Sequence, residues 1–117
     1  MLCLYYTINS LKGYVYLICD SANELYKIGI TKGDIQKRMK KLQTGNATEL
    51  FLVNYHETNY PYRIESMLHN HFSTQNVLNE WFELSKEDIL GFTKLCNDME
   101  DRIEILKDNP FFSKNLR

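Results

Sequence analysis

Two short apolar runs, at residues 14–19 and 25–30, form the strongest pattern in the chain. Both are rich in β-branched, aromatic and aliphatic side chains, and five residues of turn type separate them. This composition predicts two β-strands joined as a hairpin. Pairing Tyr16 with Gly29 places the apolar side chains of both strands on one face, whereas a shift of one residue would put Lys27 among them. The pattern therefore predicts the register in which Tyr16 lies opposite Gly29.

The other face of this predicted hairpin brings together a phenol and an ammonium, those of Tyr16 and Lys27. Gly29 lies opposite the phenol and has no side chain, so it leaves room for another group to approach the ring. This face is the first candidate for chemistry in the chain.

Apolar residues recur at helical spacing in three later segments. The predicted helices are residues 35–43, a segment that begins at residues 59–61, and residues 86–106. The stripes of these helices comprise Ile35, Met39 and Leu42; Ile64, Met67, Leu68 and Phe72; and the heptad-like series Ile89, Phe92, Cys96, Met99, Ile103 and Leu106. The first helix has an N-cap at Gly33 or Asp34. A near capping box at Ser85 opens the third helix.

Between the first two helices, residues 50–56 read as a third strand, with an alternation of Leu50, Leu52 and Asn54 on one face and Phe51, Val53 and Tyr55 on the other. Residues 2–8 predict an additional strand or terminal extension, and residues 75–79 a polar loop.

The predicted fold is α/β of the α+β type, a small three-stranded antiparallel sheet flanked by helices in the order β-β-α-β-α-α. We expect four segments: an N-terminal strand or extension at 1–11, a main domain at 12–85, a long helix at 86–107 and a tail at 108–117. The long helix either packs on its own domain or pairs with another chain as a homodimer.

Composition places the chain in the globular class, because 44% of its 117 residues are hydrophobic and 25% are charged. Residues 1–63 hold eight Lys and Arg against five Asp and Glu, a net charge of +3, and residues 64–117 hold six against ten, a net charge of −4. The first half is thus the side that a polyanion would meet, unless both halves are simply solvated surfaces.

The three cysteines are odd in number and lack metal-ligand spacing, which predicts reduced thiols rather than a disulfide framework. The first twelve residues lack the basic and apolar regions of a signal peptide, and no apolar run is long enough to span a bilayer. We therefore expect an intracellular, cytoplasmic protein, or one acting in a host cell if its source is viral, with no membrane partner.

Two side chains on the predicted helices have positions that suit ligand binding. Arg38 lies about 60° from Ile35 around the helix, at the border of the apolar stripe, where its guanidinium needs an anion or carbonyl groups nearby. The alternative is an arginine that extends to solvent or pairs with a carboxylate. Glu65 and His69 are four residues apart on one flank of the second helix, either as an ordinary surface pair or as metal ligands.

The residues that meet on the hairpin also carry a family resemblance. Tyr14-Val15-Tyr16 stands where the GIY-YIG nuclease superfamily has its first motif, and Lys27-Ile28-Gly29 stands where it has its second. The variant Tyr-Lys-Ile-Gly followed by Ile30-Thr31 resembles the phage- and virus-rich branch of that superfamily. Glu80-Trp81-Phe82 resembles the signature that closes the core of this branch. The resemblance covers about residues 12–85, and within it Arg38 follows the motif glycine by nine residues.

The resemblance implies a metal-dependent endonuclease that hydrolyses phosphodiester bonds in DNA. Glu65 would hold Mg²⁺ or Mn²⁺, Tyr16 would activate or position the attacking water, and Arg38 would bind the phosphate. Lys27 would complete the catalytic set, either beside Tyr16 or on the phosphate. The remaining predicted contacts with DNA are Gly29, Lys32, Lys37, Lys41 and His69.

Two other functions stay open at the level of the sequence. The first is a nucleic-acid-binding module of the same fold with weak cleavage or none, which the modest net charge and the presence of Lys27 in place of a tyrosine favour. The second is a partner-binding domain that uses residues 86–107.

Overall fold

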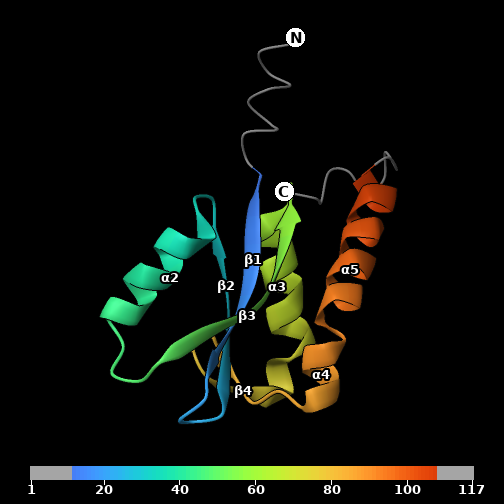
Figure 1. Ribbon diagram of the computed structural model, residues 1–117. Coiled ribbons are helices and arrows are strands. Elements are labelled where there is room, and N and C mark those ends of the chain that lie inside the picture. Colours follow the sequence, from blue (N-terminus) through green and yellow to red (C-terminus); the bar gives the residue numbers. More distant parts are fainter. Residues whose placement is uncertain (1–11, 108–117) are drawn as a thin grey trace.

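The computed structural model describes residues 12–107, and Figure 1 shows their arrangement. Its elements are β1 (Gly13–Asp20), β2 (Leu25–Thr31), α2 (Ile35–Thr44), β3 (Leu50–Thr58), α3 (Pro61–His71), the 3₁₀ turn η1 (Ser73–Gln75), β4 (Asn76–Leu78), β5 (Trp81–Phe82), α4 (Lys86–Leu90) and α5 (Phe92–Lys107). The α+β class is confirmed. The expected strand at residues 2–8 and the tail at 108–117 lie outside the described residues.

The described sheet has five antiparallel strands in the order β3-β1-β2-β5-β4, so the prediction of three strands was wrong. The two additional strands have three residues and two residues, which is too short to show a period in the sequence. Side chains fix this hairpin, because the Asn76 amide donates to Trp81 O at 3.1 Å and the Gln75 amide donates to Glu83 O at 2.9 Å. Within the predicted loop at 75–79, residues 76–78 are therefore a strand of the sheet.

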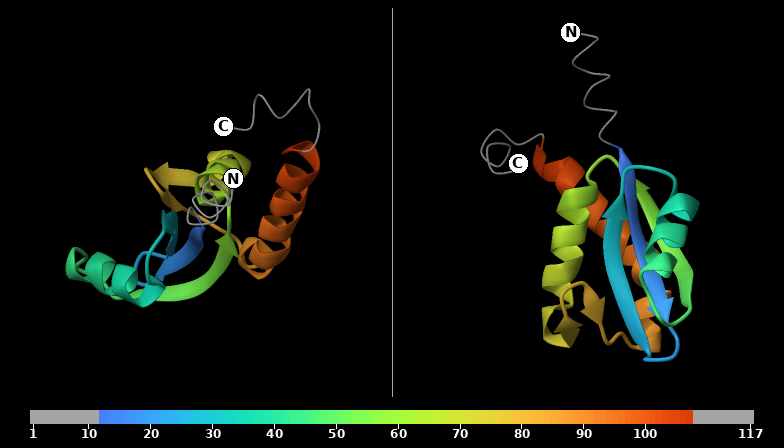
Figure 2. Two further views of the ribbon diagram at one scale, coloured as in Figure 1. Left: turned by 90° about the horizontal axis from the view of Figure 1, so that it is seen from above. Right: turned by 90° about the vertical axis from the view of Figure 1, so that its left-hand side faces the viewer.

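The central hairpin has the predicted register, with Tyr16 opposite Gly29 and Ile18 opposite Lys27. Each face of the sheet accordingly has its own apolar cluster. On one face Tyr16 and Ile18 pack with Leu50 beneath α2. Figure 2 shows α2 on this face and α3 and α5 on the opposite face.

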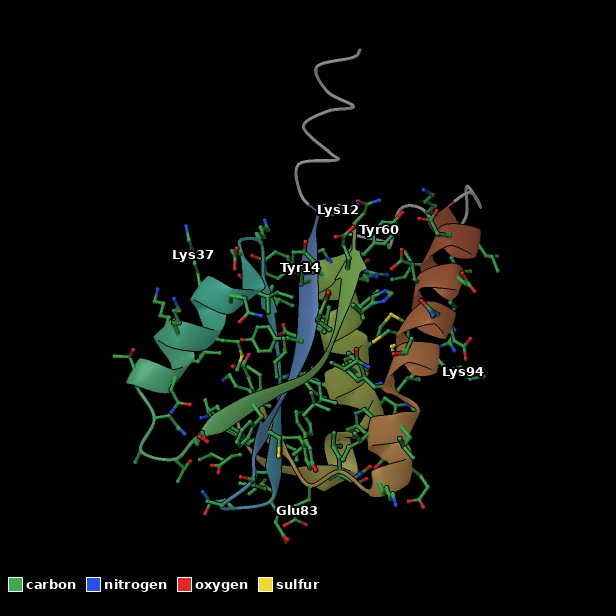
Figure 3. All side chains as sticks on the ribbon, in the orientation of Figure 1. Lys12, Tyr14, Lys37, Tyr60, Glu83 and Lys94 are labelled. Carbon is green, nitrogen blue, oxygen red and sulfur yellow. The ribbon has the colours of Figure 1, made fainter. Side chains whose placement is uncertain are left out.

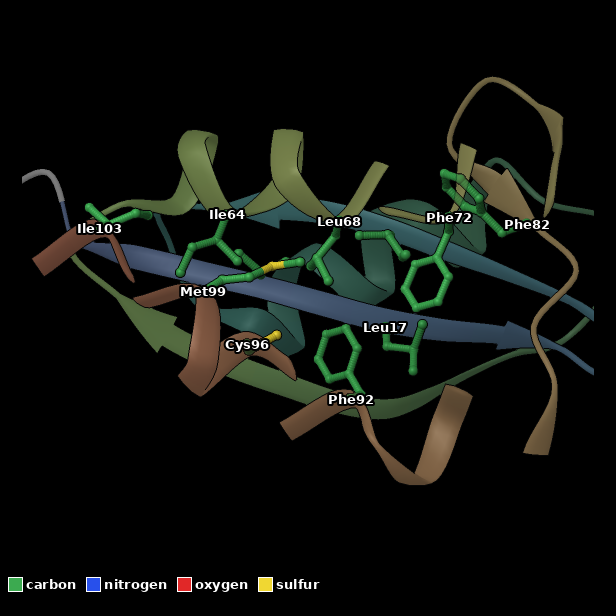
Figure 4. Packing of buried hydrophobic residues seen from close by; sticks show 11 residues of the cluster. Leu17, Ile64, Leu68, Phe72, Phe82, Phe92, Cys96, Met99 and Ile103 are labelled. Carbon is green, nitrogen blue, oxygen red and sulfur yellow. The ribbon is translucent and has the colours of Figure 1, made fainter. Parts of the chain in front are cut away.

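The larger core fills the space between the sheet and the helices α3 and α5, as Figure 4 shows. It buries the apolar stripes of both helices against β1 and β2, and its members include Leu17, Ile28, Ile64, Leu68, Phe72, Phe82, Phe92, Cys96, Met99 and Ile103. Phe82 lies in this core, whereas its neighbour Trp81 is half-buried on the α2 face. The seam of α5 thus packs on its own domain, and a homodimer through residues 86–107 stays a prediction.

The predicted single helix at 86–106 is two helices, which meet at Gly91. The hydrogen bonds from Gly91 N to Glu87 O and from Leu95 N to Gly91 O continue across the junction. The backbone at Gly91 has φ −87° and ψ 1°, outside helical values, and glycine has a low preference for helix interiors. The capping box that opens α4 is formed by Ser85 and Asp88.

Strand β3 departs from simple alternation at Val53. Leu17 pairs with Asn54 and Ile18 with Leu52, so Val53 is an additional residue without a partner in β1, which is a β-bulge. As a result Leu52 packs on the α2 face, whereas the Asn54 amide donates to Thr93 Oγ1 on the α5 face. The predicted alternation is correct before the bulge and inverted after it.

The helix ends follow local chemistry. The Asp34 carboxylate accepts from Lys37 N at 3.1 Å and caps α2, which decides between the two predicted caps. Pro61 occupies the first turn of α3, where its missing N–H costs no hydrogen bond. Among the helices that the structure describes, none has both the length and the apolar character needed to cross a membrane.

Candidate functional site

Tyr16 lies against the backbone of Gly29. The Tyr16 side chain is buried, and a Cβ at residue 29 would lie 2.5 Å from its Oη and 2.7 Å from its Cζ. Real Cβ atoms do not approach other atoms so closely, so the phenol takes this place because Gly29 has no side chain. From the sequence we expected the missing side chain of Gly29 to leave room for another group to approach the ring. Instead, the Tyr16 ring itself fills this space and is held against the backbone of Gly29.

Arg38 comes to the same place from α2. The Tyr16 hydroxyl is the main cause of a raised pKa of Arg38. Tyr16 Oη and Arg38 Nε are both buried, and neither atom has a hydrogen-bond partner among the described residues. Buried polar atoms without partners are rare, and they indicate a place where a ligand or water completes the hydrogen bonds.

Lys27 reaches this area from β2 and is held there by two neighbours. Its ammonium pairs with the Glu80 carboxylate at 2.6 Å and lies 5.6 Å from the centre of the Trp81 ring. The side chain of Lys27 is 14% exposed and that of Glu80 is 41% exposed, so the pair is partly shielded from water. Trp81 opens β5, which pairs with β2 at Lys27, and Glu80 directly precedes this strand.

Three possible metal ligands meet beside this ion pair. Glu65, His69 and Glu80 each offer a ligand atom within 4.8 Å of the other two. Burial is the main cause of a raised pKa of Glu65; the charge of Glu80 adds to it, whereas His69 and Lys27 oppose it. Two carboxylates that share one partly buried place disfavour each other's charge, which a bound cation would relieve.

His69 is oriented by the edge of the sheet. Strand β5 pairs with β2 only at Tyr26 and Lys27, and Ile28 N then donates to Glu80 O. In the described sheet the carbonyl oxygen Ile28 O has no strand partner on this side and is met by His69 instead, whose Nε2 lies 2.9 Å from it. A proton on Nε2 leaves Nδ1 as a lone-pair donor, the arrangement that fixes the tautomer of metal-binding histidines.

Glu80 connects the two halves of the site. Its negative charge acts on Glu65, as described above, and it also contributes to the raised pKa of Arg38, after the larger effect of the Tyr16 hydroxyl. Glu80 thus pairs with Lys27 and lies beside Glu65 and His69, and its charge also acts on Arg38. We treat these side chains and Tyr16 as one candidate group, drawn from β1, α2, β2, α3 and the residue before β5.

The predicted lysines lie outside this group. Lys37 and Lys41 are exposed on α2, and Figure 3 shows Lys37 pointing into solvent. Lys32 follows β2, and its ammonium lies 5.0 Å from the centre of the Tyr62 ring. The structure places all three on the surface beside α2, where contacts with a long polyanion are feasible.

Sequence reasoning missed Glu80 as a member of the site. The residue was recognised only as part of the Glu-Trp-Phe signature, with no chemistry attached to it. Its position directly before the aromatic pair was a usable signal, because a strand that pairs with β2 at Lys27 brings the preceding carboxylate close to that ammonium. The strand itself was too short to predict, so the contact was not predicted either.

The donors at this site suit a hard divalent cation. Two carboxylates and an imidazole nitrogen supply oxygen and nitrogen ligands, and Mg²⁺ binds through one or two carboxylates together with water and phosphate oxygens. Beside them Arg38 and Tyr16 offer a guanidinium and a hydroxyl to an anion. These are the types of side chain that a divalent cation and a phosphate require.

No curated protein and no solved structure matches the chain. One protein-family model does match it, that of the T5orf172 domain, a GIY-YIG-like, phage-associated and nuclease-type family, over residues 13–97. This match covers the sheet, α2, α3 and the start of α5, and with them every side chain of the candidate site, so the chain belongs to the T5orf172 domain family.

Proposed function

We propose that the protein is a metal-dependent endonuclease that hydrolyses phosphodiester bonds in DNA. The observation that carries this proposal is the meeting of the Tyr16 hydroxyl and the Arg38 guanidinium, both with unsatisfied buried atoms, with the cluster of Glu65, His69 and Glu80. Membership of a nuclease-type family supports it.

In this proposal Glu65 and Glu80 hold Mg²⁺ or Mn²⁺, and His69 contributes Nδ1. When bound, the cation supplies Lewis-acid stabilisation of charge on the phosphate oxygens. Arg38 binds the scissile phosphate and offsets the charge that grows on it in the transition state. The Tyr16 hydroxyl accepts a hydrogen bond from the attacking water and positions it, a role for which its fixed place against Gly29 is suited.

Lys27 has a positioning role in this scheme. Its ammonium is hydrogen-bonded to Glu80, so it holds that carboxylate beside Glu65. Lys27 stands where the second motif has a tyrosine. This substitution is compatible with cleavage if Glu80, the carboxylate that Lys27 holds, is itself needed for activity.

Supercoiled plasmid incubated with the protein and Mg²⁺ or Mn²⁺ tests the proposal. We expect nicking by the wild type, and a loss of about a hundredfold or more in rate for each of Glu65→Ala, Arg38→Ala and Tyr16→Phe, as for removal of one group that stabilises a transition state. Glu83→Ala removes an exposed carboxylate three residues from Glu80 and should leave the rate unchanged. Normal cleavage by both Arg38→Ala and Tyr16→Phe would contradict the mechanism.

One observation favours a second candidate function, a DNA-binding module without cleavage. The Lys27–Glu80 ion pair, at 2.6 Å, already neutralises one carboxylate of the cluster and competes with a cation for it. If this pair prevents metal binding, wild type and Glu65→Ala bind DNA equally well and neither cleaves it.

A further inference from the structure

A groove lies beside the candidate site, between the sheet and the start of α2. Its volume is about 500 Å³, within the range of small-molecule sites. Tyr14, Leu52 and Tyr55 form an apolar side, and Lys32 and Gln36 line it from the segment that leads into α2. Such a groove offers flat apolar surface next to polar and cationic groups.

Two aromatic rings lie in this groove. The ring centres of Tyr14 and Tyr55 are 5.8 Å apart, with the planes at 75°, so the two form an edge-to-face pair. Tyr55 is 52% exposed, which leaves much of its ring open to a ligand. The π-face of an exposed tyrosine is a surface on which nucleobases of any sequence stack.

The bulge at Val53 places Tyr55 there. Without it, Tyr55 would continue the alternation of Phe51 and Val53 and would point to the face opposite Leu52. With it, Tyr55 pairs with Tyr16 across the strands and shares the α2 face with Leu52. Bulges are frequent beside active sites, where they redirect a side chain.

The charges around the groove suit a polyanion. Helix α2 carries Lys37, Arg38, Lys40 and Lys41 and no acidic residue. The nearby carboxylates are engaged, because Asp34 caps α2 and Glu57 pairs with Lys12 at 2.8 Å.

The groove shares the α2 face of the sheet with Tyr16 and Arg38, the phosphate-binding part of the candidate site. Tyr14 precedes Tyr16 by two residues, about 7 Å along β1 at the usual rise of a strand. Ile35, which lines the groove, lies one helical turn before Arg38. A nucleic acid whose phosphate lies at Tyr16 and Arg38 therefore has a neighbouring nucleotide over Tyr14 and Tyr55.

We propose that this groove binds an unpaired nucleobase of DNA by stacking on Tyr55, so that the protein selects single-stranded or branched DNA. The inference rests on the proposed function for the place of the phosphate. A base inside a duplex has both faces stacked on its neighbours, so only an unpaired or extruded base presents a face to Tyr55.

Fluorescence anisotropy with a labelled single-stranded DNA oligonucleotide and with the matching blunt duplex tests this proposal. The titrations contain EDTA, so that binding is measured without cleavage. We expect the wild type to bind the single strand at least tenfold more tightly than the duplex at equal salt. Tyr55→Ala should weaken binding of the single strand about tenfold and binding of the duplex little, whereas Tyr55→Phe keeps the ring and should behave as wild type.

The matched control is Phe51→Ala. Phe51 lies on the same strand, is 49% exposed and pairs with Cys19, on the face opposite α2. The Phe51→Ala variant should bind both probes as the wild type does. A wild type that binds the duplex as tightly as the single strand would overturn the proposal, and so would equal single-strand affinity of Tyr55→Ala and Phe51→Ala.

This experiment separates the groove from the chemistry. The protein could prefer single-stranded DNA, lose this preference in Tyr55→Ala, and cleave no DNA with Mg²⁺ or Mn²⁺. This result would support the groove proposal and contradict the proposed nuclease activity. Conversely, the protein could cleave plasmid in a way that depends on Glu65 but bind single-stranded and duplex DNA equally well. This result would support the nuclease activity and contradict the groove proposal.

Discussion

A methyl group at position 29 would enter the space that the Tyr16 phenol fills. The clash in Gly29→Ala is steric rather than conformational, since no described glycine has positive φ. We expect a loss of about 1–3 kcal/mol in the free energy of unfolding, as for overpacking of a filled site, and a larger loss in cleavage because the phenol is displaced. Urea unfolding and plasmid nicking measure the two effects.

Gly33→Ala is the control, because the nearest atom to an added Cβ there is Thr31 Oγ1, at 4.0 Å. It should be neutral in urea unfolding, the assay to which this control applies. If Gly29→Ala were equally neutral, the close approach of ring and backbone would not be what positions the phenol.

Asp20 stabilises the hairpin turn through its ionised form. Its carboxylate accepts from the Asn23 amide at 2.8 Å and from Asn23 N at 3.3 Å, and these bonds lower the pKa of Asp20 below 3.8. A lowered pKa in the folded state gives stability that is present above the unfolded value and is lost as the pH falls through the folded value. Asp20→Asn should therefore cost about 1 kcal/mol in the free energy of unfolding at pH 7.

The difference between wild type and Asp20→Asn should shrink as the pH falls below 3.8, the ordinary value for an aspartate. Urea titrations at a series of pH values measure it, with Glu24→Gln as a control that removes an exposed charge from the same turn. A difference that stays constant with pH would show that the charge of Asp20 is not what matters.

At the scale of single residues, the sequence predicted positions where the chemistry of a side chain allows only one environment. Lys27 cannot lie among the core side chains, and that fact predicted the register that brings Tyr16 to Gly29. It was uninformative for Glu80, whose position depends on a strand of two residues. Nor could it predict that His69 donates to Ile28 O, because this bond depends on where β5 stops.

Helix α4 is short, and its start depends on the capping box. Ser85 Oγ accepts from Asp88 N at 3.1 Å, and Asp88 Oδ2 accepts from Ser85 N at 2.9 Å and from the Gln75 amide at 2.8 Å. The cap thus also connects α4 to η1. We expect Ser85→Ala to reduce the free energy of unfolding by about 1 kcal/mol, measured by urea unfolding.

Ser66→Ala serves as the comparison for this change, because Ser66 is exposed within α3 and alanine is the better helix former. It should be neutral or slightly stabilising. Equal effects of the two substitutions would mean that the capping bonds contribute nothing beyond helix propensity.

Elements with several turns or several alternating residues could be predicted, and irregular ones could not. The hairpin, α2, β3 and α3 follow periodic patterns, so the sequence located them to within a few residues. Both the bulge at Val53 and the junction at Gly91 are single-residue departures inside otherwise regular patterns. Each becomes visible only when the partner strand or helix is known, because tertiary packing decides it.

For the whole molecule, the separation of charge along the chain is also a separation in space. Figure 3 shows Lys37 on α2 and Lys94 on α5 at opposite sides of the sheet. Helix α2 carries four basic residues and no acidic one and shares its face with Tyr16 and the groove, whereas α5 carries four acidic residues and three basic ones. A polyanion that binds at the candidate site therefore meets the cationic side of the protein.

The salt dependence of DNA binding tests this orientation. Each cation that contacts a phosphate of a single strand adds about 0.7 to the slope of log K against log salt, because it releases a counterion. If Lys37 and Lys41 both make such contacts, the double variant Lys37→Ala with Lys41→Ala should lower the slope by about 1.4. Anisotropy titrations at several salt concentrations, in EDTA, measure it.

The matched double variant is Lys86→Ala with Lys94→Ala, which removes the same charge from α4 and α5. Because both pairs change the net charge equally, a nonspecific effect of charge would move both slopes alike. A specific interface on the α2 face lowers the slope only for the first pair. Equal slopes for the two double variants would place DNA elsewhere on the molecule, and the phosphate would then not reach Tyr16 and Arg38 along the path proposed.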